Sequence, residues 1–384
     1  MLGLRQRRIP QGSCRCREQR RHSMNINERV LKNDERVALR LRDLYRTYGY
    51  HQYKMSKFEE YDLYARNKDF LVSDNVITFT DTNGKLMALK PDVTLSIVKN
   101  TKDEEGLHKV YYDENVYRIS GSSRAYREIM QTGLECIGDI DDYAVTEVLM
   151  LAAESLARIS DDFVLDISQL DVVSAVIDEM GVSEETRAAL LQAVGEKNLH
   201  GIRALCENAE TLCRLVTLQG APQRVIGELR ELLVGSGALA IVERFAHIVE
   251  ALRVVGYGDK IRIDFSVIDD MNYYNGIVFK GFVNGVPAGV LSGGQYDKLM
   301  NKMGKRSGAI GFAVYLDLLE RLYESDRTYD VDVLLLYEQS VALEQLLAAA
   351  KSIEEGGESV MVCKSDAGTL RYKRLVKLTA GGNA

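Results

Sequence analysis

The sequence predicts an α+β protein, in which helices flank an antiparallel sheet that is interrupted by a helical insertion and followed by a short C-terminal β-α-β segment. Three observations predict this class. Short strands joined by Asn-Gly turns occur early in the chain and again after residue 256. Helical periodicity fills about 170–256. A single strand-helix-strand pattern fills about 330–365.

The composition is that of an ordinary globular protein. Of the 384 residues, 46% are hydrophobic and 27% are charged, which is typical of a chain with a large core. No apolar run reaches the roughly 18 residues of a membrane span, so we expect a soluble protein without membrane contacts. The six cysteines are scattered without zinc-site spacing, which favours reduced thiols, a cytoplasmic location, and no bound metal or other cofactor.

Positive charge is concentrated at the N-terminus. Residues 1–23 contain seven arginines and one glutamate, whereas residues 24–384 carry a net charge of −13. The segment has no apolar stretch of the kind found in secretory signals, so we interpret it as a disordered tail or as read-through upstream of a start at Met24. A nucleic-acid-binding arm is the alternative. The acidic remainder argues against a broad nucleic-acid surface, because phosphate contacts need clustered lysines and arginines.

The first predicted helix spans residues 34–50, with Asp34 as its N-cap and Gly49 as its C-terminal stop. A β-hairpin over 77–90 follows, with its turn at Asn83-Gly84, and a further helix begins at Pro91. The apolar positions of the first helix fall on one face at helical spacing: Val37, Leu41, Leu44, Tyr45 and Tyr48.

Two strands at 110–120 and 128–138 come next, joined by a polar loop. A helix over 141–160 and a strand over 163–169 precede the helical insertion. The chain then returns to strands, which are predicted at about 261–268, at 275–294 with a turn at Asn284-Gly285, and at 307–315, where the strand runs into a helix.

These segments together resemble the catalytic core of the histidyl-tRNA synthetases, which belong to the class II synthetases. Residues 49–64 also look like the dimer-forming first motif of that class. The resemblance covers about 28–325 and implies a class II synthetase-like antiparallel sheet that includes the helical insertion. We therefore expect a core domain over 24–325 and a separate C-terminal unit over 330–384. Five motifs occur in the family's order: KPDVT (90–94), YREIMQTGLECIG (126–138), NYYNGIVF (272–279), GGQYD (293–297) and GAIGFAVYLDLLERL (308–322).

The departures from the synthetase pattern concern ATP. Arg118 matches the arginine that binds the ATP phosphate, and Arg124 lies next to the position of a further loop arginine. Five positions are replaced: Ser120 for the adenine-binding glutamate, Ala125 for the loop arginine, Asp269 for the arginine of the histidine-specific motif, Gln295 for the arginine of the glycine-rich segment, and Leu318 for the adenine-stacking arginine.

These losses predict a chain without adenylation activity. Prepositioned cations stabilise the charge that develops at the α-phosphorus during adenylation. Each such group that is lost lowers the rate by about 10²–10³. A carboxylate at Asp269 would in addition repel a phosphate.

The residues that the resemblance assigns to the amino acid are retained. Taken alone, each has a simpler interpretation: a helix cap for the Asp-x-Thr segment, solvent exposure for the two strand residues, and ordinary packing for the two tyrosines. Their joint occurrence in family order favours a histidine pocket. The retained residues are Asp92 and Thr94 for the ammonium group, Gln131 and Glu135 on one strand face for a polar cradle, and Tyr273 and Tyr274 for the imidazole.

A synthetase-like core that keeps its histidine pocket and loses its ATP groups resembles the regulatory subunits of ATP phosphoribosyltransferase. This resemblance implies a non-catalytic chain that assembles with a short catalytic subunit, activates it in the first step of histidine biosynthesis, and confers feedback inhibition by L-histidine. It also implies a homodimer within the hetero-oligomer. We do not expect tRNA as a partner, because residues 330–384 are too few for a complete anticodon-binding domain and suggest a truncated one.

Two other functions stay open at this point. The first is a divergent but active histidyl-tRNA synthetase, which would need Arg118 and Arg124 to suffice for ATP. The second is an amino-acid-sensing module of another pathway, with histidine or a different amino acid as its signal.

Overall fold

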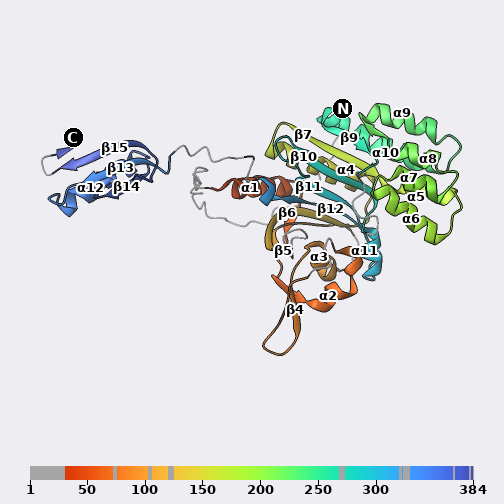
Figure 1. Ribbon diagram of the computed structural model, residues 1–384, viewed down its shortest axis with the longest axis horizontal. Helices are drawn as coiled ribbons and strands as arrows, with labels where there is room; N and C mark the ends of the chain where they lie inside the picture. The colour runs from red at the N-terminus through yellow and green to blue at the C-terminus, as the bar shows by residue number, and fades with distance from the viewer. Residues whose placement is uncertain are drawn as a thin grey trace, which may run out of the picture.

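The computed structural model describes residues 31–71, 76–102, 106–119, 125–267, 273–319, 322, 329–365, 368–379 and 382–383. The predicted tail over 1–23 lies outside these residues. The described chain contains a nine-stranded sheet, a four-stranded sheet and a three-stranded sheet, with helices packed around them (Figure 1). The boundaries that the sequence predicts, with a core over 24–325 and a C-terminal unit over 330–384, stay predictions.

The nine-stranded sheet has the order β1-β5-β6-β12-β11-β10-β7-β9-β8. All neighbours from β5 to β7 are antiparallel, whereas β1 runs parallel to β5 and β9 runs parallel to β7. The predicted antiparallel sheet is therefore present, with parallel pairs near its two edges. Its strands are β1 (His51–Gln52), β5 (His108–Ile119), β6 (Tyr126–Gly138), β7 (Phe163–Gln169), β8 (Gln219–Gly220), β9 (Ile261–Asp264), β10 (Asn275–Val283), β11 (Leu291–Gln295) and β12 (Gly308–Tyr315).

Helices α1 (Asn33–Thr47) and α4 (Asp142–Ile159) pack against one face of this sheet in a continuous apolar core. The two helices are joined by a hydrogen bond of 3.0 Å between the buried hydroxyls of Tyr45 and Ser155. Helix α4 begins after Asp141, whose carboxylate accepts a hydrogen bond from the Ala144 N–H at 2.8 Å and so caps the helix.

Two details of the predicted first helix are wrong. The N-cap of α1 is Lys32, and Asp34 lies inside the first turn, where its charge still complements the helix dipole. Tyr48 follows the end of the helix and is 37% exposed, because the chain turns there through Gly49 with φ of +81°. The other four residues predicted on the buried face of the helix are buried.

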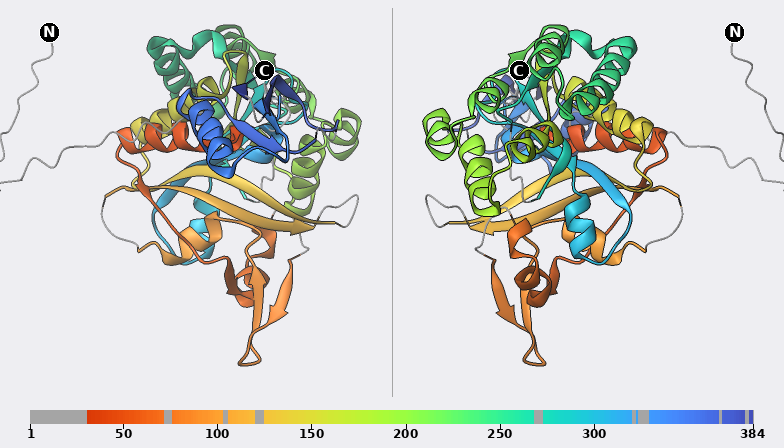
Figure 2. Two further views of the ribbon diagram at one scale, coloured as in Figure 1. Left: turned by 90° about the vertical axis from the view of Figure 1, so that its left-hand side faces the viewer. Right: turned by 90° about the vertical axis from the view of Figure 1, so that its right-hand side faces the viewer.

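The second face of the sheet carries the smaller elements α2 (Tyr61–Arg66), η2 (Lys68–Phe70), α3 (Thr94–Asn100) and α11 (Asp297–Lys302), with a separate apolar cluster beneath them. The three-stranded sheet has the order β2-β4-β3, and its hairpin projects from the body in Figure 2. Its strands are β2 (Phe58–Glu60), β3 (Thr78–Thr80) and β4 (Leu86–Leu89).

The predicted hairpin is confirmed, and its turn is held by Asp81, whose carboxylate accepts from the N–H groups of Asn83 and Lys85 at 2.8 Å. Pro91 does not open the next helix, as the sequence suggested. Helix α3 begins three residues later, at Thr94.

The helical insertion follows β7 without a loop, as predicted. A short strand inside it, β8, pairs with β9 and was not predicted, because two residues are too few to show a pattern. The elements are α5 (Leu170–Glu179), α6 (Glu184–Gly195), α7 (Leu199–Leu205), α8 (Glu210–Leu215), α9 (Pro222–Leu232), α10 (Ala238–Leu252), η3 (Arg253–Tyr257) and η4 (Gly258–Lys260).

The C-terminal unit contains the predicted β-α-β pattern and one further long strand. Strand β15 lies parallel to β13 on the side opposite β14, and it was missed because its exposed charged residues hide the alternation. The predicted helix after β12 is only a 3₁₀ turn, η5 (Leu316–Leu319), within the described residues. The unit consists of β13 (Val331–Tyr337), α12 (Leu343–Glu355), β14 (Val360–Cys363), β15 (Tyr372–Thr379) and β16 (Gly382–Asn383). No helix among the described residues is long and apolar enough to cross a bilayer.

Substitution of Leu149 by alanine tests the α4 core. Leu149 is fully buried against the sheet, so Leu149→Ala is expected to lower the free energy of unfolding by about 2–5 kcal/mol. Leu86 on the hairpin is 46% exposed, and Leu86→Ala serves as the control, with an expected change of about 0.5 kcal/mol. Denaturant unfolding of both variants measures the difference, and equal losses would contradict this assignment of the core.

Candidate amino-acid-binding site

A cavity of about 550 Å³ lies on the face of the central sheet opposite α1 and α4. Strand β6, strand β12, the start of α3 and the segment before β10 all contribute to its lining. This volume is in the range of small-molecule sites. All six residues that the sequence assigns to an amino acid line it: Asp92, Thr94, Gln131, Glu135, Tyr273 and Tyr274.

Gln131 and Glu135 reach the cavity because β6 alternates its side chains between two faces. Both are on the predicted common face, and they are 3% and 2% exposed, so solvent exposure is the wrong interpretation for both. The residue between them is Gly133, where a β-carbon would overlap the Tyr112 ring. The missing side chain lets a tyrosine from β5 pack between the two polar groups.

Glu135 is the most constrained group of the cavity. Its carboxylate accepts hydrogen bonds from the Thr94 hydroxyl at 2.8 Å and from the Tyr296 hydroxyl at 2.6 Å. A β-carbon on Gly311 of the neighbouring strand would overlap this carboxylate, so the glycine is needed for its placement. Burial raises the pKa of Glu135 to about 8, although the two hydroxyls and their hydrogen bonds oppose the shift.

Gln131 carries an unused donor. Its Nε2 atom is buried and has no hydrogen-bond partner among the described residues. An unpaired buried donor costs on the order of 1–3 kcal/mol, and most such groups in folded proteins are satisfied. A ligand atom that accepts a hydrogen bond at this position would remove the cost.

Asp92 makes a capping contact and also lines the cavity, so its role toward an ammonium group stays a prediction. Its Oδ1 atom accepts from the Leu95 N–H at 2.8 Å at the start of α3, which is a capping contact. The same side chain lines the cavity. Burial raises the pKa of Asp92, while the backbone N–H of Leu95 and the charge of Arg118 act in the opposite direction. A cation in the cavity would favour the charged form of this carboxyl group.

Tyr273 and Tyr274 both line the cavity because they precede β10, which begins at Asn275, and so escape the alternation of a strand. Their ring centroids are 4.5 Å apart with an interplanar angle of 63°, an edge-to-face arrangement. Phe70 and Tyr296 each lie 5.9 Å from the Tyr273 ring, and Tyr273 is only 8% exposed. The result is an aromatic wall.

Of the residues that the sequence places at the degenerate ATP site, only Arg118 lines the cavity within the described part of the chain. Its Nε donates to the Pro91 carbonyl oxygen at 3.0 Å. Gln295 accepts from the Ile277 N–H at 2.9 Å, where the β10–β11 pairing is bulged. Ala125 is exposed and Leu318 packs partly on the apolar core. Ser120 and Asp269, like Arg124, lie outside the described residues.

Several lining residues were not predicted. Tyr296 lies directly after Gln295 in the glycine-rich segment, and a single tyrosine there does not by itself indicate a cavity. Lys280 lies on β10 and lines the cavity, but a single lysine in a predicted strand does not indicate a cavity face. Other lining residues that the sequence did not indicate are Phe70, Tyr112, Ser292 and Tyr315.

The raised pKa of Glu135 predicts a pH dependence of stability. The folded chain holds this proton more tightly than the unfolded chain, whose glutamates titrate near 4.5. The stabilisation is therefore fully present below about pH 4.5 and is lost as the pH rises through about 8. Each pKa unit corresponds to about 1.4 kcal/mol, so the effect amounts to a few kcal/mol at most.

Glu135→Gln is expected to remove this contribution. Denaturant unfolding of the wild-type chain and of the variant at a series of pH values measures it. The wild-type free energy of unfolding is expected to fall more steeply toward alkaline pH than that of the variant. Parallel curves would show that folding does not raise the pKa of Glu135.

Comparisons with known proteins agree with this fold. A family model described as histidyl-tRNA synthetase matches residues 24–319. The ATP phosphoribosyltransferase regulatory subunits of Ruminiclostridium cellulolyticum and Bacillus cereus are each 28% identical, over 322 and 321 residues. In both cases the match covers 79% of this chain and 76% of the relative.

Solved structures show the same architecture. A protein of Bacillus halodurans, described as an ATP phosphoribosyltransferase regulatory subunit/histidyl-tRNA synthetase, has a TM-score of 0.74 at 23% identity over 90% of this chain and 94% of its own. The histidyl-tRNA synthetase of Nostoc sp. PCC 7120 has a TM-score of 0.68 at 18% identity over 91% of this chain and 89% of its own. At these identities the likeness establishes the fold alone. Together with the family match, it shows that the chain belongs to the histidyl-tRNA synthetase family and has the class II synthetase-like fold, with regulatory subunits of ATP phosphoribosyltransferase among its relatives.

Proposed function

We propose that this chain is a non-catalytic regulatory subunit of ATP phosphoribosyltransferase that binds L-histidine in the cavity. In this proposal it assembles with a short catalytic subunit, activates it, and transmits feedback inhibition. The names of the relatives support the assignment as a regulatory subunit and, with it, a role in histidine biosynthesis. The observation that carries the ligand is the convergence of buried polar groups with an aromatic wall in one cavity.

The polar groups suit the ammonium and imidazole groups of histidine. The Asp92 carboxylate offers a partner for the ammonium group, near the Thr94 hydroxyl. A neutral imidazole has one N–H donor and one nitrogen acceptor. The Nε2 atom of Gln131, which has no hydrogen-bond partner among the described residues, suits the acceptor nitrogen, and an oxygen of the Glu135 side chain suits the N–H group. The edges and faces of the tyrosine rings supply apolar contact for the ring.

The mechanism we propose is thermodynamic linkage. Histidine binds more tightly to one arrangement of the complex, and the ratio of its two affinities limits how far it shifts the equilibrium of the catalytic partner. Coupling of about 1–3 kcal/mol is typical. In this proposal the chain forms a homodimer within the hetero-oligomer, and it needs no cofactor and no tRNA.

The residues of the predicted degenerate ATP site support a loss of catalysis. The Arg118 guanidinium is engaged with the Pro91 carbonyl, and the Gln295 amide is engaged with the backbone of β10. Neither arrangement supplies the set of cations that a triphosphate requires. Asp269, at the place of a synthetase arginine, would add repulsion.

Asp92→Ala is expected to abolish histidine binding, because it removes the only carboxylate assigned to the ammonium group. Feedback inhibition of the reconstituted complex should be relieved while assembly is unchanged. Calorimetric titration with L-histidine and inhibition of the complex measure the two effects. Lys109→Met, on the opposite face of β5, is the control. If L-histidine still fully inhibits the complex that contains Asp92→Ala, the effector binds elsewhere.

Histidine-dependent ATP–pyrophosphate exchange separates this proposal from the second candidate, an active histidyl-tRNA synthetase, which the family match favours. No exchange above background is expected from the purified chain. Robust exchange would overturn the regulatory proposal. Co-purification of a short phosphoribosyltransferase would separate the regulatory proposal from an amino-acid sensor of another pathway.

A further inference from the structure

The segment over residues 90–94 forms one wall of the cavity although it belongs to no strand. It connects β4 to α3, and Asp92, Val93 and Thr94 all line the cavity. A wall without ladder hydrogen bonds needs other contacts to hold it at a fixed distance from the opposite side.

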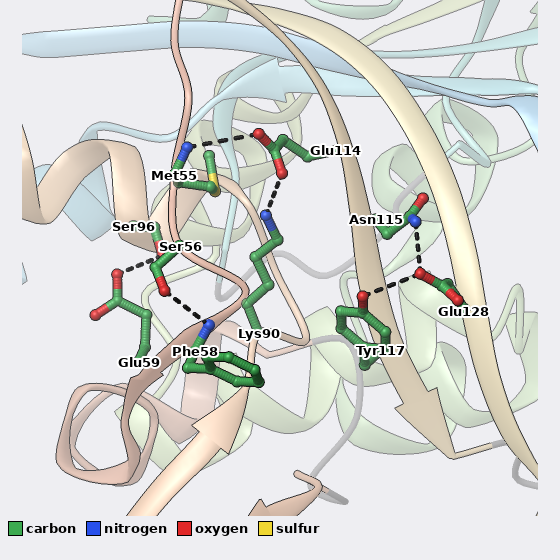
Figure 3. Close-up of polar contacts among 10 residues, drawn as sticks. All are labelled: Met55, Ser56, Phe58, Glu59, Lys90, Ser96, Glu114, Asn115, Tyr117 and Glu128. Carbon is green, nitrogen blue, oxygen red and sulfur yellow. Dashed lines mark hydrogen bonds and ion pairs between the residues drawn. The ribbon is translucent and has the colours of Figure 1, made fainter. Parts of the chain in front are cut away.

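Three contacts fasten this segment to β5. The Lys90 ammonium group forms an ion pair with the Glu114 carboxylate at 2.5 Å. The Tyr117 N–H donates to the Lys90 carbonyl oxygen at 2.9 Å, and the Arg118 Nε donates to the Pro91 carbonyl oxygen at 3.0 Å. Figure 3 shows the Lys90 side chain extended toward Glu114.

The lysine of this ion pair is buried and the glutamate is half-buried, which separates the pair from an exposed surface salt bridge. The Lys90 side chain is 0% exposed and the Glu114 side chain is 16% exposed. Exposed pairs contribute little to stability, whereas a charge left alone in a buried site is strongly unfavourable. The Glu114 carboxylate also accepts from the Met55 N–H at 3.5 Å, so it joins a second segment to the same strand (Figure 3).

The strand register connects this pair to the far wall. Glu114 on β5 pairs directly with Gln131 on β6, and Glu135 lies four residues further along the same strand. The pair therefore links the segment that carries Asp92 to the strands that carry the other polar residues. Neither Lys90 nor Glu114 lines the cavity.

We propose that the Lys90–Glu114 ion pair is a clamp that positions Asp92 relative to Gln131 and Glu135, and so sets the spacing between the ammonium and imidazole ends of the ligand. Lys90 and Glu114 are positioning residues, and Arg118 is a second point of attachment of the same segment. The identity of the ligand rests on the proposed function, whereas the clamp itself rests on the contacts.

Glu114→Gln tests the clamp, because it removes the charge and keeps the size of the side chain. We expect faster hydrogen exchange of the amides over residues 91–97 in the unliganded chain. We also expect L-histidine to bind about tenfold more weakly. The preference for L-histidine over 3-(imidazol-4-yl)propionate, which lacks the amine, should fall by the same factor.

The matched control is Lys109→Met. Lys109 and Glu147 form an ion pair of the same 2.5 Å length from the same strand, with side chains 19% and 4% exposed, but it faces α4. This variant is expected to lose stability without altering exchange over 91–97 or the preference for the amine.

The outcomes separate the two proposals. Unchanged exchange over 91–97 in Glu114→Gln would overturn the clamp, whatever the chain binds. Equal effects of Glu114→Gln and Lys109→Met on this segment would show that the ion pair contributes only to global stability, and this result would also overturn the clamp. A third outcome combines two results: exchange is faster in Glu114→Gln alone, and the wild-type chain binds no L-histidine. This outcome would support the clamp and refute the proposed function.

Discussion

The buried carboxylate of Glu135 is the constraint on which the cavity depends. It lies where the sheet, the start of α3 and the glycine-rich segment meet, and it accepts hydroxyl hydrogen bonds from the last two. The strand beside it must present Gly311, since any side chain there would occupy the same space. The removal of this group from water is unfavourable for its charged form, and burial therefore raises its pKa. Such a group needs fixed partners around it, and these partners are the walls of the site.

The two faces of the central sheet differ in what covers them. One face is covered by α1 and α4 and forms a continuous apolar core. The other face carries smaller elements and leaves a cavity in which polar side chains are buried. The rigid strands β5 and β6 are shared by both. A ligand that bridges the segment over 90–94 and β6 would therefore act on a wall whose position is set by a few side-chain and backbone contacts. Differential binding can arise at such a wall.

At two positions of the predicted degenerate ATP site, the residues of this chain have local structural partners. Arg118 holds the Pro91 carbonyl, and Gln295 satisfies an N–H that the bulge in the β10–β11 pairing leaves open. The architecture of the family is thus compatible with quite different residues at these positions. A fold of this kind does not by itself specify a reaction, because the chemistry depends on the side chains placed upon it.

The sequence by itself determined the fold class, the helical insertion, the β3–β4 hairpin and the common face of Gln131 and Glu135, because local periodicity, turn residues or motif order indicate each of them. Burial and the pairing of distant segments do not follow from such local patterns. Only the tertiary structure decided that Glu135 is buried beneath two hydroxyls, that both tyrosines reach the cavity ahead of β10, and that Lys280 and Tyr296 join them. The same reason applies to β8 and β15: a short strand, or one masked by exposed charges, is defined by the partner it pairs with.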